Sequence, residues 1–362
     1  MSGSHTPARR RPSLSRHRKA VVGLATTAVV AGGAVGYFAL VPEQAPAFVR
    51  TAMATVGLAE DAPAPTTAPR PTCPLTGEEI SKVPSRPALA VKVENYPDAR
   101  PQAGLQSADI VYEEPVEGGI TRFIAVYHCA GVDRVGPVRS ARVADPQVLS
   151  QFGVPVLAYS GGAPNVVRVV EAANLVPLDE TTGGEAFTRD PGREAPHNLF
   201  VDTSLLYQLA KAGSEAPDPV FRYSEELIGR SKRISVIHLP FSSTYADVYW
   251  SWSQKAREWR RSHGDVPHVD EAGDPISAIN VVVQLVPVVI GPHGGLTPHL
   301  DLTGSGRAYV FRDGRMIAGR WERETLHDIT RFITKDGDEI ALAPGRTWVE
   351  LFPSGLEVGT AR

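Results

Sequence analysis

Hydrophobic positions along the chain form one long uncharged run and, after a polar stretch, many short apolar segments. The long run covers residues 20–41, which are mostly small or β-branched and carry no charge. At 1.5 Å per residue it is long enough to cross a hydrocarbon core of about 30 Å as one helix. The pattern therefore predicts a single N-terminal transmembrane helix.

Beyond residue 88, segments of strand length alternate with segments of helix length. Strand-like runs occupy residues 89–93, 109–117, 120–128 and 154–159. Helices are expected after the capping residues Asp145 and Asp202 and from Pro164, because such residues open helices. This alternation predicts an α+β or α/β domain over residues 73–225.

The pattern changes after about residue 219, where β-branched and aromatic runs dominate. Strands are predicted within residues 234–239, 248–252, 279–289, 308–311 and 348–352. Asp313-Gly314 and Asp336-Gly337 supply the Asp-Gly pairs that favour tight hairpin turns. Residues 226–362 are therefore expected to be mainly β, either as an independent domain or as a continuation of the first sheet.

Charge at the N-terminus predicts how the chain is oriented. Residues 1–19 contain only basic charges, at Arg9, Arg10, Arg11, Arg16, Arg18 and Lys19. Basic residues stay on the cytoplasmic side, so the C-terminal bulk is expected outside a plasma membrane that the chain crosses once. The alternative is a cleavable signal peptide ending near Ala45-Pro46-Ala47, which would make the protein secreted. Residues 42–72, rich in Pro, Ala and Thr, predict an extended linker.

Composition and cysteine usage narrow the class of protein. A net charge of -3 with 42% apolar residues describes a chain that can bury a core and lacks the basic field of a nucleic-acid-binding protein. The chain has two cysteines, Cys73 and Cys129, and both follow the predicted membrane helix. Because disulfides persist in an oxidising compartment, we expect these two to be bridged.

The segment around Gly118-Gly119 is the first candidate for a site. With a two-residue turn, Glu117 faces Ile120, and alternation places Asp109, Glu113, Glu117 and Arg122 on one face. Such a face could be a surface ion-pair network or an acidic cation site with a guanidinium beside it. Asp109 is the candidate ligand for Mg²⁺, although no cofactor is certain.

Three arginines follow within a short segment, at Arg134, Arg139 and Arg142, with Ser140 among them and a predicted helix start just beyond. Guanidiniums pair bidentately with phosphate or carboxylate, and helix N-termini offer free N–H groups. The segment therefore predicts binding of an anionic ligand. Pairing with Glu113 and Glu117 is the structural alternative.

Weaker signals lie downstream. Ser160, Gly161 and Gly162 precede a predicted helix and resemble a phosphate-cradling turn, and His197 with Asn198 could complete a polar site. The chain lacks a Walker or dinucleotide fingerprint and a nucleophile elbow, and its histidines lack zinc-site spacing.

Several motifs together resemble the YerB-like family of bacterial lipoproteins. They are the segments 90–97, 100–105, 108–113, 119–123, 136–142, 159–162, 197–199, 280–284 and 344–348. The resemblance covers nearly all of the chain after Cys73. It implies an envelope protein without an assigned activity. The chain departs from the family in that a membrane helix replaces the lipidated cysteine, since no lipobox precedes Cys73.

A weaker similarity links the chain to the LytR–CpsA–Psr ligases, which transfer glycopolymers from polyprenyl carriers to the cell wall. The order Asp109, then Arg139 or Arg142, then Gly161-Gly162 runs parallel to the order of their site motifs. The chain departs from them because Val143 follows Arg142 where an aspartate is expected. This similarity implies at most a related architecture, since a fold does not establish a function.

The sequence thus predicts an extracytoplasmic, membrane-anchored envelope protein that binds a phosphate-bearing or glycan ligand. Arg122, Arg139 and Arg142 would hold the ligand, and Glu113 and Glu117 would organise them. One alternative is a transferase of phosphoryl or glycan-phosphate groups that uses Mg²⁺ on Asp109 and acts on a polyprenyl-phosphate ligand. Another is a non-catalytic scaffold whose C-terminal region docks an envelope partner.

Overall fold

The structure is a computed structural model that describes residues 70–210, 215–242, 244–290 and 297–362. The predicted cytoplasmic tail, the membrane helix over 20–41 and the linker up to residue 69 lie outside the described residues. Within the described ranges, no helix is long and apolar enough to span a bilayer. Residues 70–362 form one compact unit.

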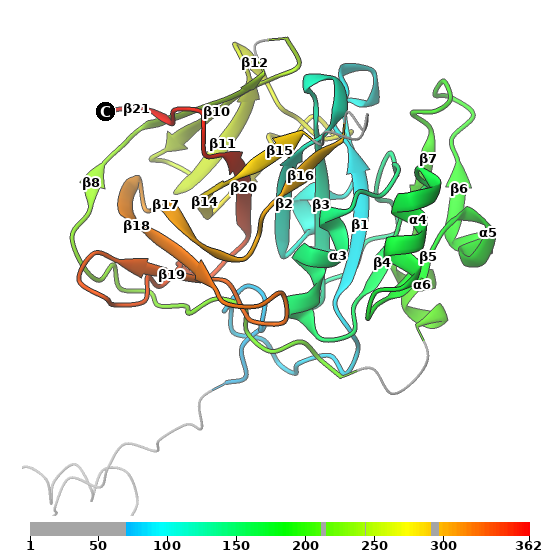
Figure 1. Ribbon diagram of the computed structural model, residues 1–362, viewed down its shortest axis with the longest axis horizontal. Coiled ribbons are helices and arrows are strands. Elements are labelled where there is room, and N and C mark those ends of the chain that lie inside the picture. The colour runs from blue at the N-terminus through cyan, green and yellow to red at the C-terminus, as the bar shows by residue number, and fades with distance from the viewer. Residues whose placement is uncertain (1–69, 211–214, 243, 291–296) are drawn as a thin grey trace, which may run out of the picture. The chain divides into compact units, whose positions relative to one another are not determined.

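A mixed sheet of eleven strands runs through this unit (Figure 1). Its strands, in spatial order, are β19 (Arg331–Thr334), β18 (Arg315–Arg323), β17 (Gly304–Arg312), β14 (Asn280–Val286), β20 (Thr347–Pro353), β2 (Ile110–Pro115), β3 (Thr121–Tyr127), β1 (Leu89–Glu94), β4 (Val156–Ala158) and β5 (Val176–Leu178). The short β8 (Lys232–Arg233) pairs with β18. This sheet combines strands from both halves of the chain.

A second sheet packs on one face of the first. Its order is β12 (Val266–Pro267), β11 (Glu258–His263), β10 (Ala246–Ser253), β9 (Val236–Ser242) and β21 (Gly359–Ala361), with β13 (Ser277–Ala278) beside β11. Two small ladders complete the β structure: β6 (Phe187–Arg189) with β7 (Leu199–Val201), and β15 (Val288–Ile290) with β16 (Pro298–Leu300).

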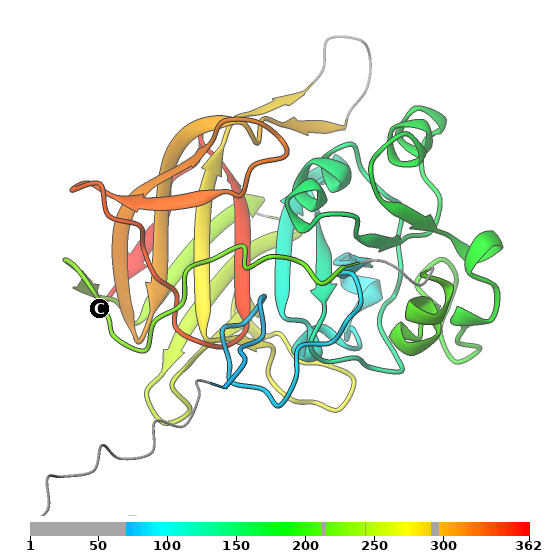
Figure 2. The same cartoon turned by 90° about the horizontal axis from the view of Figure 1, so that it is seen from below.

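Helices gather at the end of the large sheet that holds β1, β4 and β5 (Figures 1 and 2). They are α3 (Ala144–Leu149), α4 (Pro164–Glu171), α5 (Glu180–Gly183) and α6 (Thr203–Leu209). Single 3-10 turns cover Pro97–Ala99, Leu105–Ser107, Glu117–Gly119, Ser150–Phe152 and Gly184–Ala186. Asp202 caps α6, as predicted, by accepting hydrogen bonds from the Ser204 and Leu205 N–H groups.

Alternation along the strands divides the core into two layers. One side chain in two, such as Val91, Phe123 and Trp348, faces the second sheet, where the Trp250 and Trp348 rings lie 5.2 Å apart. The intervening residues, such as Ile124, pack under α3 and α4 in a separate cluster. Residues at neighbouring positions of a strand therefore belong to different cores.

The prediction of a mixed fold with a mainly β C-terminal region is confirmed. That region was expected to be either an independent domain or a continuation of the first sheet, and it is a continuation. β14 and β20 continue the first sheet, because β20 pairs in parallel with both β14 and β2. The Asp313-Gly314 turn joins β17 and β18 with Arg312 opposite Arg315, as the Asp-Gly signal predicted. Both turn residues have positive φ, 52° and 65°, which such a hairpin requires.

The predicted register of the β2–β3 hairpin is wrong by one residue. Glu114, and not Pro115, lies opposite Arg122, so Arg122 and Glu113 are on opposite faces of the sheet. The reason is a three-residue connection, Glu117–Gly119, in which Gly118 and Gly119 both have positive φ. A two-residue turn was expected, and one extra residue moves every side chain to the other face.

Asp145 also differs from its predicted role. It lies in the first turn of α3 and does not cap the helix, which begins at Ala144. Its carboxylate accepts a hydrogen bond from the Arg142 N–H, with 2.7 Å between the heavy atoms. Asp145 therefore holds the backbone of Arg142, at the end of the arginine-rich segment.

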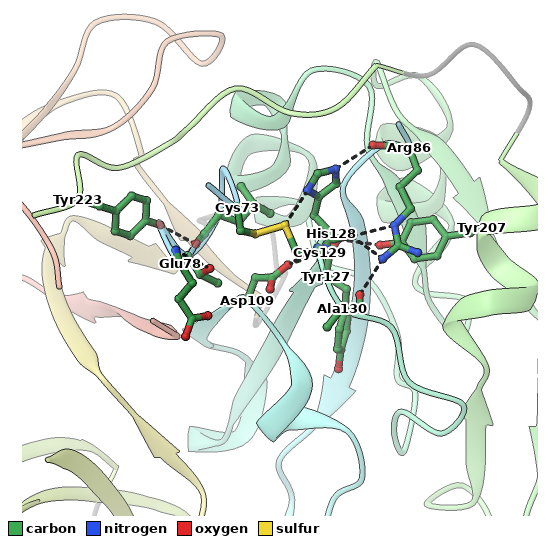
Figure 3. Close-up of a disulfide and its surroundings, with 12 residues drawn as sticks. Cys73, Glu78, Arg86, Asp109, Tyr127, His128, Cys129, Ala130, Tyr207 and Tyr223 are labelled. Atoms are coloured by element: carbon green, nitrogen blue, oxygen red, sulfur yellow. Dashed lines mark hydrogen bonds between the residues drawn. A yellow bond between two sulfur atoms is a disulfide. The ribbon is translucent and has the colours of Figure 1, made fainter. Parts of the chain in front are cut away.

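The predicted disulfide between Cys73 and Cys129 is present (Figure 3). It joins the N-terminal segment of the compact unit to the residue that follows β3 by two positions. The two cysteines are 56 residues apart. Closing a loop of this length stabilises the folded state by about 4 kcal/mol in the chain-entropy model.

Candidate functional site

Most of the predicted site residues meet at one edge of the large sheet. β1, β2 and β4 run parallel to one another, so their carboxyl ends share an edge. The antiparallel β3 starts at this edge, with Arg122 as its second residue. Glu94 ends β1, and the loop of Ser160, Gly161 and Gly162 follows β4. Open α/β sheets bind ligands at such carboxyl edges.

Arg122 is the most unusual side chain of this edge. It is 6% exposed, and its guanidinium donates to the Ser140 carbonyl oxygen at 3.0 Å. Its Nε atom is buried without a partner, and no described carboxylate forms an ion pair with it. Burial, with the positive charges of Arg142 and Arg139 nearby, lowers its pKa to about 10. The charges of Glu117 and Glu94 offset part of this shift. A buried cation without a directly paired carboxylate is costly, so the position favours an added anion.

Arg139 and Arg142 flank Arg122, and each has one carboxylate partner. The Arg139 Nε donates to Glu94 at 3.0 Å, and the Arg142 Nε donates to Glu117 at 2.9 Å. Glu117 also accepts a hydrogen bond from Thr297. Burial raises the pKa of Glu117, but the hydrogen bonds from Thr297 and Arg142 outweigh this effect and leave the pKa below its ordinary value. These pairs hold the two arginines at the rim of the edge.

The Ser160–Gly162 loop lies directly against the arginine segment. The Ser160 N–H donates to the Arg139 carbonyl oxygen, and the Ala141 N–H donates to the Gly161 carbonyl oxygen, both at 3.0 Å. Gly161 has a φ of 61°, a conformation in which glycine is favoured. The predicted turn and the predicted arginines are therefore parts of one surface.

His197 reaches the same edge, whereas Asn198 does not. The His197 Nδ1 lies 2.9 Å from a Glu94 carboxylate oxygen, so Glu94 contacts both His197 and Arg139. The Asn198 side chain accepts a hydrogen bond from Arg189 and stabilises the β6–β7 connection. The two residues were predicted as one polar pair, and only His197 belongs to the edge.

Asp109 lies at the opposite end of β2 from Arg139 and Arg142. It is beside the disulfide, next to His128 and Cys129 (Figure 3). Its Oδ2 accepts hydrogen bonds from the N–H groups of His128 at 2.6 Å and Cys129 at 3.1 Å. Burial raises its pKa to about 6, and these two hydrogen bonds offset part of that rise. Asp109 therefore cannot hold a cation beside Arg139 and Arg142, as the transferase hypothesis requires.

Glu113 faces the second sheet and belongs to a buried polar cluster that the sequence did not indicate. Arg261 on β11 donates to both Glu113 oxygens, at 2.8 and 2.7 Å, and both side chains are fully buried. Glu350 on β20 lies opposite Glu113, and Trp250 donates to it at 2.7 Å. Burial raises the pKa of Glu350 well above its ordinary value, and the charge of Glu113 adds to the rise.

Two histidines complete this cluster. The Arg261 Nη1 lies 2.7 Å from His263 and 3.0 Å from His268, and His268 contacts Gln102 at 2.8 Å. Burial and the neighbouring Arg261 charge lower the pKa of both histidines, so both are neutral. No local motif could have revealed this cluster, since it joins β2, β11 and β20 through long-range strand pairing.

The sequence also missed a basic groove on the second half of the chain. It has a volume of about 940 Å³, and its lining includes Lys232, Arg233, Arg257, Arg315, Arg362 and Trp252. Arg257 pairs with Asp313 at 3.2 Å. The groove is a second basic surface, made by elements distant in sequence from the arginine edge.

The chain is similar to known proteins over most of its folded part. Residues 75–216 match the family described as "Protein of unknown function (DUF3048) N-terminal domain", and residues 237–349 match its C-terminal domain. "Putative lipoprotein YerB" of Bacillus subtilis (strain 168) is 29% identical over 302 residues, covering 80% of this chain and 88% of that protein. A crystal structure of YerB from Bacillus subtilis has a TM-score of 0.71 at 26% identity, covering 81% of this chain and 100% of the other.

Proposed function

The chain belongs to the YerB-like family, as its motifs predicted, and we propose that it is an extracytoplasmic envelope protein that binds an anionic ligand at the arginine edge. The ligand class is phosphate-bearing or glycan. Arg122 binds the anion, and Arg139 and Arg142 surround it. Glu94 and Glu117 hold these two flanking arginines in place, a role that the sequence had given to Glu113 and Glu117.

The single observation that carries this proposal is the state of Arg122. Its guanidinium is buried between two other arginines, and it has no acid partner among the described residues. If the three arginines only stabilised the fold, the most buried of them would be expected to have a carboxylate partner, because an uncompensated buried charge is costly. Bidentate pairing with a phosphate or carboxylate would use the unpartnered N–H groups.

The extracytoplasmic location rests on three further observations. The Bacillus subtilis relative is named as a lipoprotein, a class that is anchored outside the cytoplasm by a lipidated cysteine. In this chain, six basic residues before the uncharged run 20–41 favour anchoring by a helix, with the folded unit outside. A disulfide in that unit fits an oxidising compartment.

The location predicts the behaviour of a topology reporter. A reporter fused after Arg362 that is active only outside the cytoplasm should be active, and a cytoplasm-specific reporter at the same position should be inactive. Changing the six basic residues to neutral ones should weaken this orientation, because the charge bias sets it. Activity of the cytoplasmic reporter in the unaltered chain would contradict the proposed location.

The ligand is tested with the full chain and two probes, a polyprenyl phosphate and soluble cell-wall glycan, which separate the two ligand sources. Arg122→Met should weaken binding of the preferred probe by about tenfold or more, because one or two charge-assisted hydrogen bonds are lost. The folded state should remain as stable as before, since the substitution removes a buried charge without an acid partner.

The matched control is Lys232→Gln with Arg315→Gln, which removes two charges from the basic groove and leaves the edge intact. It should bind the probe as the unaltered chain does. If Arg122→Met binds normally and the control does not, the groove is the binding surface. If neither probe binds to the unaltered chain, the proposed ligand class is wrong.

A further inference from the structure

A second unusual group lies beneath the arginine edge, in the core between the large sheet and α3. Lys92 of β1 points into this core, where its side chain is 0% exposed. Its Nζ lies 2.6 Å from Asp145 Oδ1 and also contacts Glu114 Oε1. Asp145 is 0% exposed and Glu114 is 1% exposed, so all three groups are closed off from solvent.

The charges of this group do not balance when all three are ionised. One ammonium then faces two carboxylates, and Glu114 Oε2 has no hydrogen-bond partner among the described residues. Burial raises the pKa of Glu114 to about 7, although the neighbouring Lys92 charge offsets part of the rise. Glu114 can therefore take up and release a proton within the group.

We propose that Lys92 and Asp145 condense to an intramolecular amide cross-link, with Glu114 as the residue that transfers protons. The arrangement contains an amine, an acceptor carboxyl and a carboxyl acid–base group in a closed apolar environment. A lysine and an aspartate at this distance are already oriented, which replaces the entropy cost of bringing two reactants together. The nucleophile is the neutral amine, which forms when Glu114 takes a proton from the Lys92 ammonium.

The reaction balances without an added reagent. Lys92 Nζ gives one proton to Glu114 and attacks Cγ of Asp145, forming the new N–C bond. The Arg142 N–H donates to Asp145 Oδ2 and would stabilise the negative charge that develops there. Glu114 returns its proton to Oδ1, the second Nζ proton follows by the same route, and Oδ1 leaves as water. An ammonium and a carboxylate thus become a neutral amide and one water molecule.

The product would change both the charge and the mechanics of the edge. A neutral amide removes a buried cation and a buried anion from the core, and it links β1 covalently to α3. The Arg142 N–H keeps an acceptor, because Oδ2 remains as the amide oxygen. The segment with Arg139 and Arg142 contacts both β1 and α3, so a covalent link between these two elements would hold the segment in place.

Peptide mass mapping of the full chain, purified after expression and reduced to open the disulfide, tests the proposal. We expect the Lys92 peptide and the Asp145 peptide to be recovered as one branched species. Its mass should be that of both peptides minus one water molecule, and Lys92 should resist acetylation. Glu114→Gln should leave the two peptides separate, because no group transfers the proton.

Asp145→Asn is the variant that separates chemistry from packing. An asparagine can lose ammonia where aspartate loses water, so this variant should end in a branched species of the same mass as the unaltered chain. A merely structural ion pair would give two separate peptides. Recovery of a free, acetylatable Lys92 in the unaltered chain overturns the proposal, whether or not the variants fold.

Discussion

The buried carboxyl of Asp109 accepts hydrogen bonds from two backbone N–H groups, and the shift of its pKa predicts how its ionisation affects stability. Burial raises its pKa from 3.8 to about 6, and the N–H groups of His128 and Cys129 hold one of its oxygens. A carboxyl with a raised pKa binds its proton more tightly in the folded state. Its contribution to stability is therefore complete below pH 3.8 and is lost as the pH rises through about 6.

Asp109→Asn should remove this pH dependence, because the amide is neutral and still offers an oxygen to both N–H groups. At pH 7.5 the variant should be more stable by at most about 3 kcal/mol, and the difference should vanish near pH 4. Thermal unfolding of both proteins across this range measures it. Parallel stability curves would mean that Asp109 is not buried as described.

Single residues also show where prediction from the sequence reached its limit. Composition and motifs were sufficient to single out Arg122, Arg139, Arg142, Glu117 and His197, which do lie at one edge. They could not identify Glu94 as the partner of Arg139, because that pairing depends on which face each strand presents. The isolated position of Arg122 follows from three-dimensional packing and leaves no sequence signal.

Between elements, the Glu113–Arg261 pair joins the two sheets through their most buried charges. Arg261→Met would leave Glu113 buried next to Glu350 without its cation. We expect a loss of about 3–5 kcal/mol in the free energy of unfolding, as is typical when one partner of a buried pair is removed.

The double variant Arg261→Met with Glu113→Gln tests the cause of that loss. It should recover much of the stability, because glutamine carries no charge and can still donate or accept hydrogen bonds. Chemical denaturation of the single and double variants measures the difference. A double variant that is as unstable as Arg261→Met alone would assign the loss to packing of the arginine stem.

Some local signals defined their elements, whereas others left the details underdetermined. Asp313-Gly314 defines its hairpin because few other residues tolerate the required φ values. The Gly118-Gly119 pair predicted a hairpin as well, but two glycines fit more than one connection length. The register of β2 against β3 was therefore underdetermined, and the face of Arg122 with it.

For the whole molecule, the sequence predicted the secondary-structure content of each half of the folded part, but it could not predict how the two halves combine. The two family matches divide the chain between residues 216 and 237. The large sheet crosses this division, since β20 lies between β14 and β2. Distant strands that pair in parallel are not joined by a tight turn with a recognisable sequence, so no local pattern could have indicated this arrangement.

The position of β20 has a consequence for how the chain is made. Synthesis delivers β2 early, but the neighbour that covers one edge of β2 is among the last strands to emerge. Until then the nascent sheet carries an open edge that other chains could pair with. Such non-local pairing also slows folding, because a long loop must close first. The amino-terminal half therefore matures only when translation is almost finished, and a ribosome that stalls before residue 347 leaves it incomplete.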